Sequence, residues 1–305
     1  MFESILFGIV FAATFGGIAA FRYFGADHRM FDIPNERSSH VAPTLRGAGV
    51  VMVAVCLVTY LLVGRLFEVE IKWVYICSVL LVAAISWLDD VRGVAPVIRL
   101  LIHGVAAGLI VGQYGGLSIF NLAGTIGPIP LEWVGSLLSF LWIVWFTNAY
   151  NFMDGIDGLA GGQAVVAGLA WGILGYLTGD QTIAMIGFTV AASGIAFLFH
   201  NWPPASVFMG DVGSAYLGFT FATMPLLAGQ GSESGGPWVA IAAFVFVWLF
   251  VVDSVFTFLR RALNGEKVWV AHRQHLYQKL VIGGSSHGAV SSLYICTGAF
   301  IVLLY

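Results

Sequence analysis

Apolar stretches of roughly 17 to 25 residues, the length at which a helix crosses about 30 Å of hydrocarbon, recur along the whole chain. These stretches are apolar on all sides, as in helices that face lipid and one another, whereas the helices of soluble domains are amphipathic. Only 10% of the residues are charged, against about 25% in a typical soluble domain. The sequence therefore predicts an all-α polytopic membrane protein that forms a single domain over residues 1–305.

We predict ten transmembrane helices, over residues 2–24, 47–64, 72–88, 97–112, 131–147, 160–178, 181–199, 212–229, 237–258 and 289–305. The first stretch has no basic segment before it and no small-residue cleavage site, so we expect a membrane helix there rather than a signal peptide. The chain ends inside the last stretch, and a longer chain would have an eleventh helix. The segment 113–130, rich in Gly and Pro, is expected to form a small hairpin.

The basic residues indicate the orientation. With the N-terminus outside, the loops on the cytoplasmic side carry 11 of the 13 Lys and Arg residues: Arg22, Arg29, Arg37, Arg46, Arg92, Arg99, Arg260, Arg261, Lys267, Arg273 and Lys279. Only Arg65 and Lys72 remain outside. Because cytoplasmic loops of membrane proteins are enriched in Lys and Arg, we predict a chain that begins outside and crosses an even number of times.

The sequence does not favour disulfide bonds, a zinc cluster or nucleic-acid binding. The three cysteines, Cys56, Cys77 and Cys296, fall within predicted helices and form no CxxC pair, so we expect neither disulfides nor a zinc cluster. The basic residues are explained by topology and form no stripe of the kind that binds nucleic acid. We therefore expect a lipid bilayer and no nucleic acid among the partners.

Polar residues able to carry chemistry gather on the predicted cytoplasmic side. They are Asp89, Asp90, Asn148, Asn151, Asp154, Asp157, His200, Asn201, Asp211, His272 and His275. The acids on the other side occur singly. This separation predicts an active surface that faces the cytoplasm.

The adjacent carboxylates of Asp89 and Asp90 stand at the inner end of the third predicted helix. Two neighbouring carboxylates at a low-dielectric border repel each other unless a divalent cation or a proton compensates them. The alternative is a solvated helix end. The helix dipole disfavours acids at a C-terminal end, however, which favours a functional role.

The segment 148–162 reads NAYNFMDGIDGLAGG. If it is helical, Asn148, Asn151, Asp154 and Asp157 recur every three residues and form a polar line on one face. Oxygen ligands of this kind suit Mg²⁺, with Mn²⁺ as the alternative, together with a phosphate. The other interpretation is a polar loop that uses Asp and Asn as helix caps.

Asp211 precedes the predicted helix 212–229. It is interpreted either as an ordinary N-cap or as part of an anion site, in which the helix N-terminus, Gly213 and Ser214 offer donors to a phosphate. The residues alone do not decide between these two.

Two loops bring basic and imidazole groups to the same side. The last long loop has His272, Arg273 and His275, donors suited to phosphoryl oxygens. A zinc site would need two more soft ligands, and none is near. The first loop adds Arg37, His40 and Arg46, which a positive-inside anchor would explain only in part.

A metal with cationic groups around it, at the depth of a lipid headgroup, is typical of phosphoryl transfer. The sequence has no P-loop, no dinucleotide-binding glycine motif and no serine-nucleophile elbow that would indicate another chemistry. The pattern therefore predicts an enzyme that joins a lipid phosphate to a soluble cytoplasmic substrate.

With those residues in view, the chain resembles the polyprenyl-phosphate N-acetylhexosamine-1-phosphate transferase family, of the glycosyltransferase family 4 type. The matching motifs are DIPNERSSHVAPTLRGAG, WLDD, NAYNFMDGIDGLAGG, FMGDVGSAYLG and AHRQHLYQKL. They occur in the order of the family and cover residues 32–280.

The resemblance implies a role for each matching position. It implies catalytic roles for Asp89, Asp90, Asp154, Asp157 and His272, and places Asn151 and Asp211 near Mg²⁺. It implies substrate binding by Arg37, His40, Arg46, Asn148, Arg273, His275 and Gln278. Asp253, Arg260 and Arg261 also fit the ninth helix of the family and its exit.

The implied reaction is Mg²⁺-dependent transfer of a HexNAc-1-phosphate from a UDP-sugar to undecaprenyl phosphate in a bacterial inner membrane. The last loop reads His275-Leu-Tyr-Gln278 where relatives that use UDP-GlcNAc often read His-x-His-His. This form resembles the subgroup that initiates O-antigen synthesis, some of whose members take FucNAc or QuiNAc. A peptidoglycan phospho-MurNAc-pentapeptide translocase, a secondary transporter and a non-catalytic scaffold are the alternatives, and the sugar and a homodimeric state stay open.

Overall fold

The computed structural model describes residues 2–24, 30–34, 43–117, 119–120, 129–228, 238–267 and 272–304. Arg37 and His40, predicted to bind substrate, lie outside the described residues. The helices are α1 (Phe2–Phe24), α2 (Gly49–Leu66), α3 (Trp73–Arg92), α4 (Pro96–Tyr114), α5 (Glu132–Met153), α6 (Leu159–Thr178), α7 (Gln181–Asn201), α8 (Gly210–Ala228), α9 (Trp238–Val245), α10 (Trp248–Leu263), α11 (Leu276–Ile282) and α12 (His287–Leu304). The strands are β1 (Phe31–Asp32), β2 (Thr44–Arg46), β3 (Ile119–Phe120), β4 (Ile129–Pro130) and β5 (Val207–Phe208).

Each of the ten predicted stretches coincides with helix in the structure, which confirms a polytopic, mainly helical membrane protein. Among the described helices, seven are long and apolar enough to cross a membrane, or eight if the bent pair α9–α10 is one span. The helices α5 and α8 do not pass that test. In α8 every residue from Val212 to Leu227 is buried in protein, so this helix has no need of a lipid-facing surface. The count of ten spans and the orientation stay predictions.

The single helix predicted over 237–258 is wrong in one respect, because it is broken. The helices α9 and α10 meet at an angle of 71°. A break inside a membrane helix leaves backbone groups that need partners within the protein. The buried amide of Gln163, on α6, donates a hydrogen bond of 2.7 Å to the Phe246 carbonyl at the break. The bend therefore has a partner that periodicity along one segment does not show.

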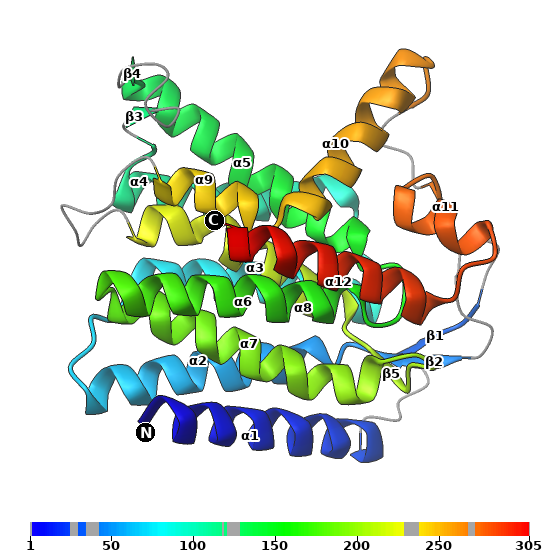
Figure 1. Cartoon of the computed structure of the whole chain (residues 1–305), viewed down its shortest axis with the longest axis horizontal. Coiled ribbons are helices and arrows are strands. Elements are labelled where there is room, and N and C mark those ends of the chain that lie inside the picture. Colours follow the sequence, from blue (N-terminus) through cyan, green and yellow to red (C-terminus); the bar gives the residue numbers. More distant parts are fainter. Residues whose placement is uncertain are drawn as a thin grey trace.

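Figure 1 shows helices α1, α2, α6, α7, α8 and α12 lying side by side, with α5 and α10 inclined to them. The strands β1, β2 and β5 and the short helix α11 lie at one end of this bundle. At the far end, β3 and β4 pair antiparallel, Ile119 opposite Pro130, which confirms the predicted hairpin. Among the described residues, the strands therefore lie at the two ends of the bundle.

The small sheet β1–β2–β5 joins the starts of α2 and α8. Strand β2 pairs in parallel with β5, Arg46 opposite Phe208. Beyond the pairing, the Gly49 N–H donates to the Met209 carbonyl at 2.8 Å. A Cβ atom on Gly49 would lie 2.3 Å from the Cα of Gly213, so the two helices approach backbone to backbone. This contact fixes where Arg46 and Asp211 stand relative to each other.

We predict that Gly49→Ala destabilises the protein by about 1–3 kcal/mol or more, because the added methyl group meets backbone that cannot move aside. The measurement is the thermal unfolding midpoint in detergent. Gly16→Ala is the matched control, since a Cβ atom there has nothing within 4 Å among the described residues. Equal midpoints for the two variants would contradict the prediction.

Candidate active site

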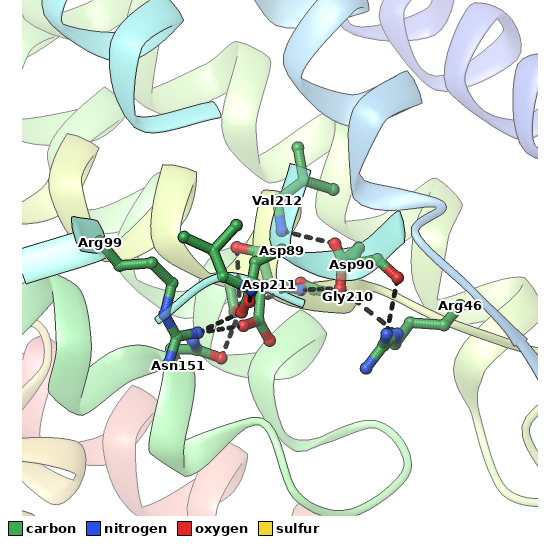
Figure 2. A network of polar contacts seen from close by, with 10 residues as sticks. Arg46, Asp89, Asp90, Arg99, Asn151, Gly210, Asp211 and Val212 are labelled. Carbon is green, nitrogen blue, oxygen red and sulfur yellow. Dashed lines mark hydrogen bonds and ion pairs between the residues drawn. The ribbon is translucent and has the colours of Figure 1, made fainter. Parts of the chain in front are cut away.

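The carboxylate of Asp90 sits at the N-terminus of α8. Its two oxygens accept the N–H groups of Asp211 and Val212, each at 3.0 Å, as Figure 2 shows. An anion is stabilised there because the first amides of a helix have no partners within the helix. Asp211 lies in the first turn of α8, so its interpretation as the residue before the helix is wrong, and the anion at this N-terminus is the Asp90 carboxylate of α3. Phosphate binding there stays a prediction. The catalytic role predicted for Asp90 stays a prediction beside this structural one.

Arg46 binds the same aspartate from β2. Its Nε lies 3.3 Å from the Asp90 carboxylate, and its Nη2 donates to the Asp90 main-chain carbonyl at 2.7 Å. Asp90 is 4% exposed, whereas the Arg46 side chain is 36% exposed. A buried carboxylate requires such compensation. The substrate-binding role predicted for Arg46 rests on its exposed part.

Asp89 and Asp211 share one cation. Arg99 Nη1 lies 2.5 Å from a carboxylate oxygen of each, and the three groups come from α3, α4 and α8 (Figure 2). The Val94 N–H also donates to Asp89, at 2.5 Å. The sequence-based prediction missed Arg99, which counted only as a positive-inside residue. The sequence feature that could have identified Arg99 is its position within the predicted helix 97–112, because an arginine inside a membrane helix is usually paired with a carboxylate or another polar group.

The polar line predicted over 148–157 is broken by the end of α5. The helix stops at Met153, so Asn148 and Asn151 lie on it and Asp154 follows it as the C-cap. Ser214 Oγ, on α8, donates to the Asn151 side-chain oxygen at 3.1 Å. The Asn148 amide donates to the Val144 carbonyl on its own helix at 2.7 Å. Ser214 also lies 3.5 Å from the Asp211 main-chain carbonyl, so Asn151 and Asp211 lie on either side of the same serine. Metal binding by the two residues stays a prediction.

Asp154 differs from the other acids of the cluster because its carboxyl group has no hydrogen-bond or ion-pair partner among the described residues. It is half-buried. Burial, then the charges of Asp90 and Asp157, raise its pKa to about 7. A carboxylate held among other carboxylates in this way favours a cation or a proton. Asp154 is therefore the carboxyl group at the site that is best placed to bind a cation.

Asp157 turns away from this cluster. It accepts the Ala205 N–H at 3.1 Å, lies 3.4 Å from His287 Nδ1 on α12, and its carbonyl accepts from Ser291 at 2.7 Å. These contacts tie the turn between α5 and α6 to α12. His287 had no role in the sequence-based prediction. The catalytic role of Asp157 stays a prediction, and its observed contacts are structural.

The basic loop before α11 is held by a buried aspartate of α10. Asp253, 1% exposed, accepts the N–H groups of Leu276 at 2.8 Å and Tyr277 at 3.2 Å. It also accepts the Tyr294 hydroxyl at 2.8 Å and lies 3.2 Å from His275 Nδ1. Asp253 therefore fixes the start of α11.

His275 and Gln278, both predicted to bind substrate, serve this anchor. The His275 ring is buried on Asp253, and the Gln278 side-chain oxygen accepts the His275 N–H at 3.2 Å. The Tyr277 hydroxyl donates to the Phe152 carbonyl at 3.0 Å, which ties α11 to the end of α5. The loop is thereby brought to the acidic cluster, and any contact of these two residues with substrate stays a prediction.

His272 keeps a partly exposed ring, 5.0 Å from the His275 ring. The Gln274 N–H donates to its Nδ1 at 3.3 Å, so the proton of the neutral ring is on Nε2. Burial, then the neighbouring His275 and Arg261, lower the pKa of His272 to about 4. At neutral pH this imidazole is an uncharged hydrogen-bond donor. Arg273 follows it in the same loop.

The donors at the site agree in kind with a hard divalent cation. Asp154, Asp211 and Asn151 offer carboxylate and amide oxygens, which Mg²⁺ prefers over nitrogen or sulfur. Within the ranges that the structure describes, no three acidic, His or Cys side chains are grouped closely enough to hold a metal. Arg99 supplies the positive charge between Asp89 and Asp211 instead. The residues thus fit the ion by their chemistry, with the unpartnered carboxyl group of Asp154 as the supporting observation.

Residues 72–229, which contain Asp89, Asp154 and Asp211, match the profile of glycosyl transferase family 4. The chain belongs to this family. The resemblance inferred from the five motifs, to polyprenyl-phosphate N-acetylhexosamine-1-phosphate transferases, is thereby confirmed.

Named relatives agree with this assignment. The chain is 30% identical over 207 residues to the probable undecaprenyl-phosphate N-acetylglucosaminyl 1-phosphate transferase of Bacillus subtilis, covering 68% of this chain and 57% of that protein. It is 30% identical over 292 residues to the decaprenyl-phosphate N-acetylglucosaminephosphotransferase of Mycolicibacterium smegmatis, covering 87% of this chain and 72% of that protein. It is also 30% identical over 252 residues to the phospho-N-acetylmuramoyl-pentapeptide-transferase of Streptococcus pneumoniae, covering 75% of each.

The Asp253 anchor gives a prediction for stability. We expect Asp253→Asn to lower the free energy of unfolding by about 3 kcal/mol, because several buried donors lose a charged acceptor. The readout is the thermal midpoint in detergent. The neighbouring Ser254→Ala is the control: its buried hydroxyl has no hydrogen-bond partner in the described parts of the chain, so its change stays within about 0.5 kcal/mol. A thermal midpoint for Asp253→Asn equal to that of Ser254→Ala would show that Asp253 does not stabilise the start of α11.

Proposed function

We propose that this protein transfers a HexNAc-1-phosphate from a UDP-sugar to undecaprenyl or another polyprenyl phosphate, with release of UMP. The supporting observation is the convergence of Asp89, Arg99, Asp211 and Asp154 at one end of the bundle, in a chain whose relatives carry polyprenyl-phosphate transferase names. In this proposal the site faces the cytoplasm of a bacterial plasma membrane, where a lipid headgroup meets a soluble nucleotide.

Mg²⁺, or Mn²⁺ in its place, would be held by Asp211, Asn151 and Asp154, and would neutralise charge on the diphosphate. The chain's own groups supply the rest. Arg99 is positioned by two carboxylates beside these oxygens, where its guanidinium meets phosphoryl oxygens. His272 donates from an uncharged ring, and Arg273 adds a positive charge from the same loop.

The acceptor needs no strong general base. A lipid phosphate is already largely ionised near neutral pH, so its oxygen is a nucleophile without prior proton removal. Asp89, already fixed by Arg99 and the Val94 N–H, would orient the acceptor, whereas Asp90 fixes α8. This division of roles separates the two adjacent aspartates, which the sequence treats alike.

The identity of the sugar is proposed from the last loop. The form of the last loop favours an initiating transferase of O-antigen or another surface polysaccharide. A second candidate is transfer of phospho-MurNAc-pentapeptide, which the similarity to the Streptococcus pneumoniae protein favours. The transporter interpretation has no comparable support, because the chain belongs to a transferase family.

The decisive experiment measures UMP release by the purified protein with undecaprenyl phosphate and Mg²⁺. The donors are UDP-GlcNAc, UDP-FucNAc, UDP-QuiNAc and UDP-MurNAc-pentapeptide, each supplied alone. We expect release with one or more UDP-HexNAc donors, and none without the lipid phosphate. UMP release only with UDP-MurNAc-pentapeptide would establish the second candidate. If none of the four donors gave UMP release, the proposed reaction would be rejected.

In the same assay, we predict that Asp211→Asn and Asp154→Asn each lower kcat by about 100-fold or more, because each removes a carboxylate that would hold the metal ion, and the metal would neutralise the negative charge that develops on the phosphates. Glu132→Gln is the matched control, an exposed acid at the start of α5 and far from the cluster. All three proteins are compared for folding by their thermal midpoints. Unchanged activity in either Asp variant would remove that residue from the site.

A further prediction concerns the pH dependence of metal binding. Since burial and nearby carboxylates raise the pKa of Asp154 to about 7, its anion forms only as the pH rises through that value. We therefore expect Mn²⁺ affinity, measured without substrates, to increase from about pH 6 to about pH 8. Asp154→Asn should bind more weakly and with a flatter pH profile. An identical profile in the variant would show that another group controls metal binding.

A further inference from the structure

A large apolar cavity lies at the end of the bundle opposite the candidate active site. It measures about 500 Å³ and lies between α1, α2, α6 and α7, within the size range of small-molecule sites. Its walls include Phe7, Val10, Val63, Met185 and Phe188. Figure 1 shows the N-terminus at this end, away from β1, β2 and β5. The phosphoryl-transfer residues contribute nothing to it.

A polar chamber of about 240 Å³ lies next to this cavity. Val69, Gly179 and Gln181 line both spaces. The chamber adds Lys72 and the acids Glu68, Glu70 and Asp180. An apolar cavity next to a charged chamber matches a molecule with a hydrocarbon chain and a polar headgroup.

The chamber is built from fixed groups. The Glu70 carbonyl accepts the hydroxyl groups of Tyr60 at 3.1 Å and Thr182 at 3.4 Å. The Lys72 N–H in turn donates to the Tyr60 hydroxyl at 2.9 Å. The turn between α2 and α3 is thereby tied to α7. A headgroup entering the chamber meets donors and acceptors already in place.

Lys72 is the central group of the chamber. It is 8% exposed, and its ammonium lies 2.6 Å from a Glu70 carboxylate oxygen and 5.8 Å from the centre of the Tyr114 ring. An ammonium group has three N–H donors, so this pair leaves capacity for a further acceptor such as a phosphate oxygen. Because Glu70 already compensates the charge of Lys72, a phosphate oxygen would bind here as an additional acceptor and not as a missing counter-ion.

The charges select the class of headgroup. One lysine and three acids line the chamber, so its formal charge is negative. A second cationic group on the ligand would be attracted to Glu70 and Asp180, while a lipid with net negative charge would be repelled. A phosphate next to a primary ammonium, as in phosphatidylethanolamine, satisfies both requirements.

We propose that this double chamber binds one phosphatidylethanolamine molecule from the leaflet opposite the active site. One acyl chain occupies the apolar cavity, the phosphate binds Lys72, and the ammonium faces the acids. The site holds a structural or regulatory lipid and is distinct from the site of the lipid phosphate substrate.

The test is native mass spectrometry of the delipidated full-length protein in detergent, mixed with equal amounts of phosphatidylethanolamine, phosphatidylcholine and phosphatidylglycerol. We expect phosphatidylethanolamine to be retained most and phosphatidylglycerol least. Equal retention of the three lipids by the wild-type protein would overturn the proposal, and this arm requires no variant to fold.

Two variants locate the site. Ala184→Leu fills the apolar cavity, and Lys72→Met removes the phosphate contact. We expect each to lower phosphatidylethanolamine retention about tenfold, the effect of losing one charge-assisted hydrogen bond or an equivalent contact. The controls are Ala84→Leu, on the exposed surface of α3, and Arg65→Met, an exposed cation at the same end; neither lines the chambers. Retention by Ala184→Leu equal to that by Ala84→Leu would refute the assigned cavity.

Discussion

The two hydrogen bonds from the start of α8 to the Asp90 carboxylate hold the central helix of this protein in place. Helix α8 is enclosed by its neighbours, and its N-terminal amides would lie unpaired at the membrane border without an acceptor. Asp90 provides that acceptor from α3, and Arg46 compensates its charge from β2. One carboxylate thus joins three segments that are far apart in the sequence. The position of Asp211, on the same turn of α8, depends on it.

The candidate site is best understood through which of its charges are compensated. Asp90 has two amides and Arg46, while Asp89 and Asp211 share Arg99. Asp154 has no such partner in the described residues, and burial, then the charges of Asp90 and Asp157, raise its pKa. A site for a divalent cation and a phosphorylated lipid requires such an imbalance, since a fully neutralised cluster would have no electrostatic preference for Mg²⁺. Arg99 and Asp154 therefore define the electrostatic character of the site.

The family motifs predicted which segments would meet, and the structure assigns different work to residues within one motif. Asp89 and Asp90 are adjacent, yet one binds Arg99 and the other caps α8, because successive helix side chains point in different directions. Asp154 and Asp157 diverge in the same way once α5 ends at Met153. His275 lies on the buried side of its loop, held by Asp253, whereas His272 stays partly exposed. The spacing of residues in a motif does not predict in which direction each side chain points, since that depends on where a helix stops and what packs against it.

The long apolar stretches by themselves determine that the chain is helical and lies in a membrane, because hydrocarbon tolerates no unpaired backbone. The charged residues, in the same way, predict which helix ends carry the chemistry. Neither pattern contains the bend between α9 and α10, because the Phe246 carbonyl finds its donor in Gln163 on a different helix. Nor does either pattern reveal that Arg99 serves two aspartates, since a positive-inside residue and a bridging cation have the same side chain. Those outcomes depend on which helices become neighbours, and only the folded bundle brings their partners within hydrogen-bonding distance.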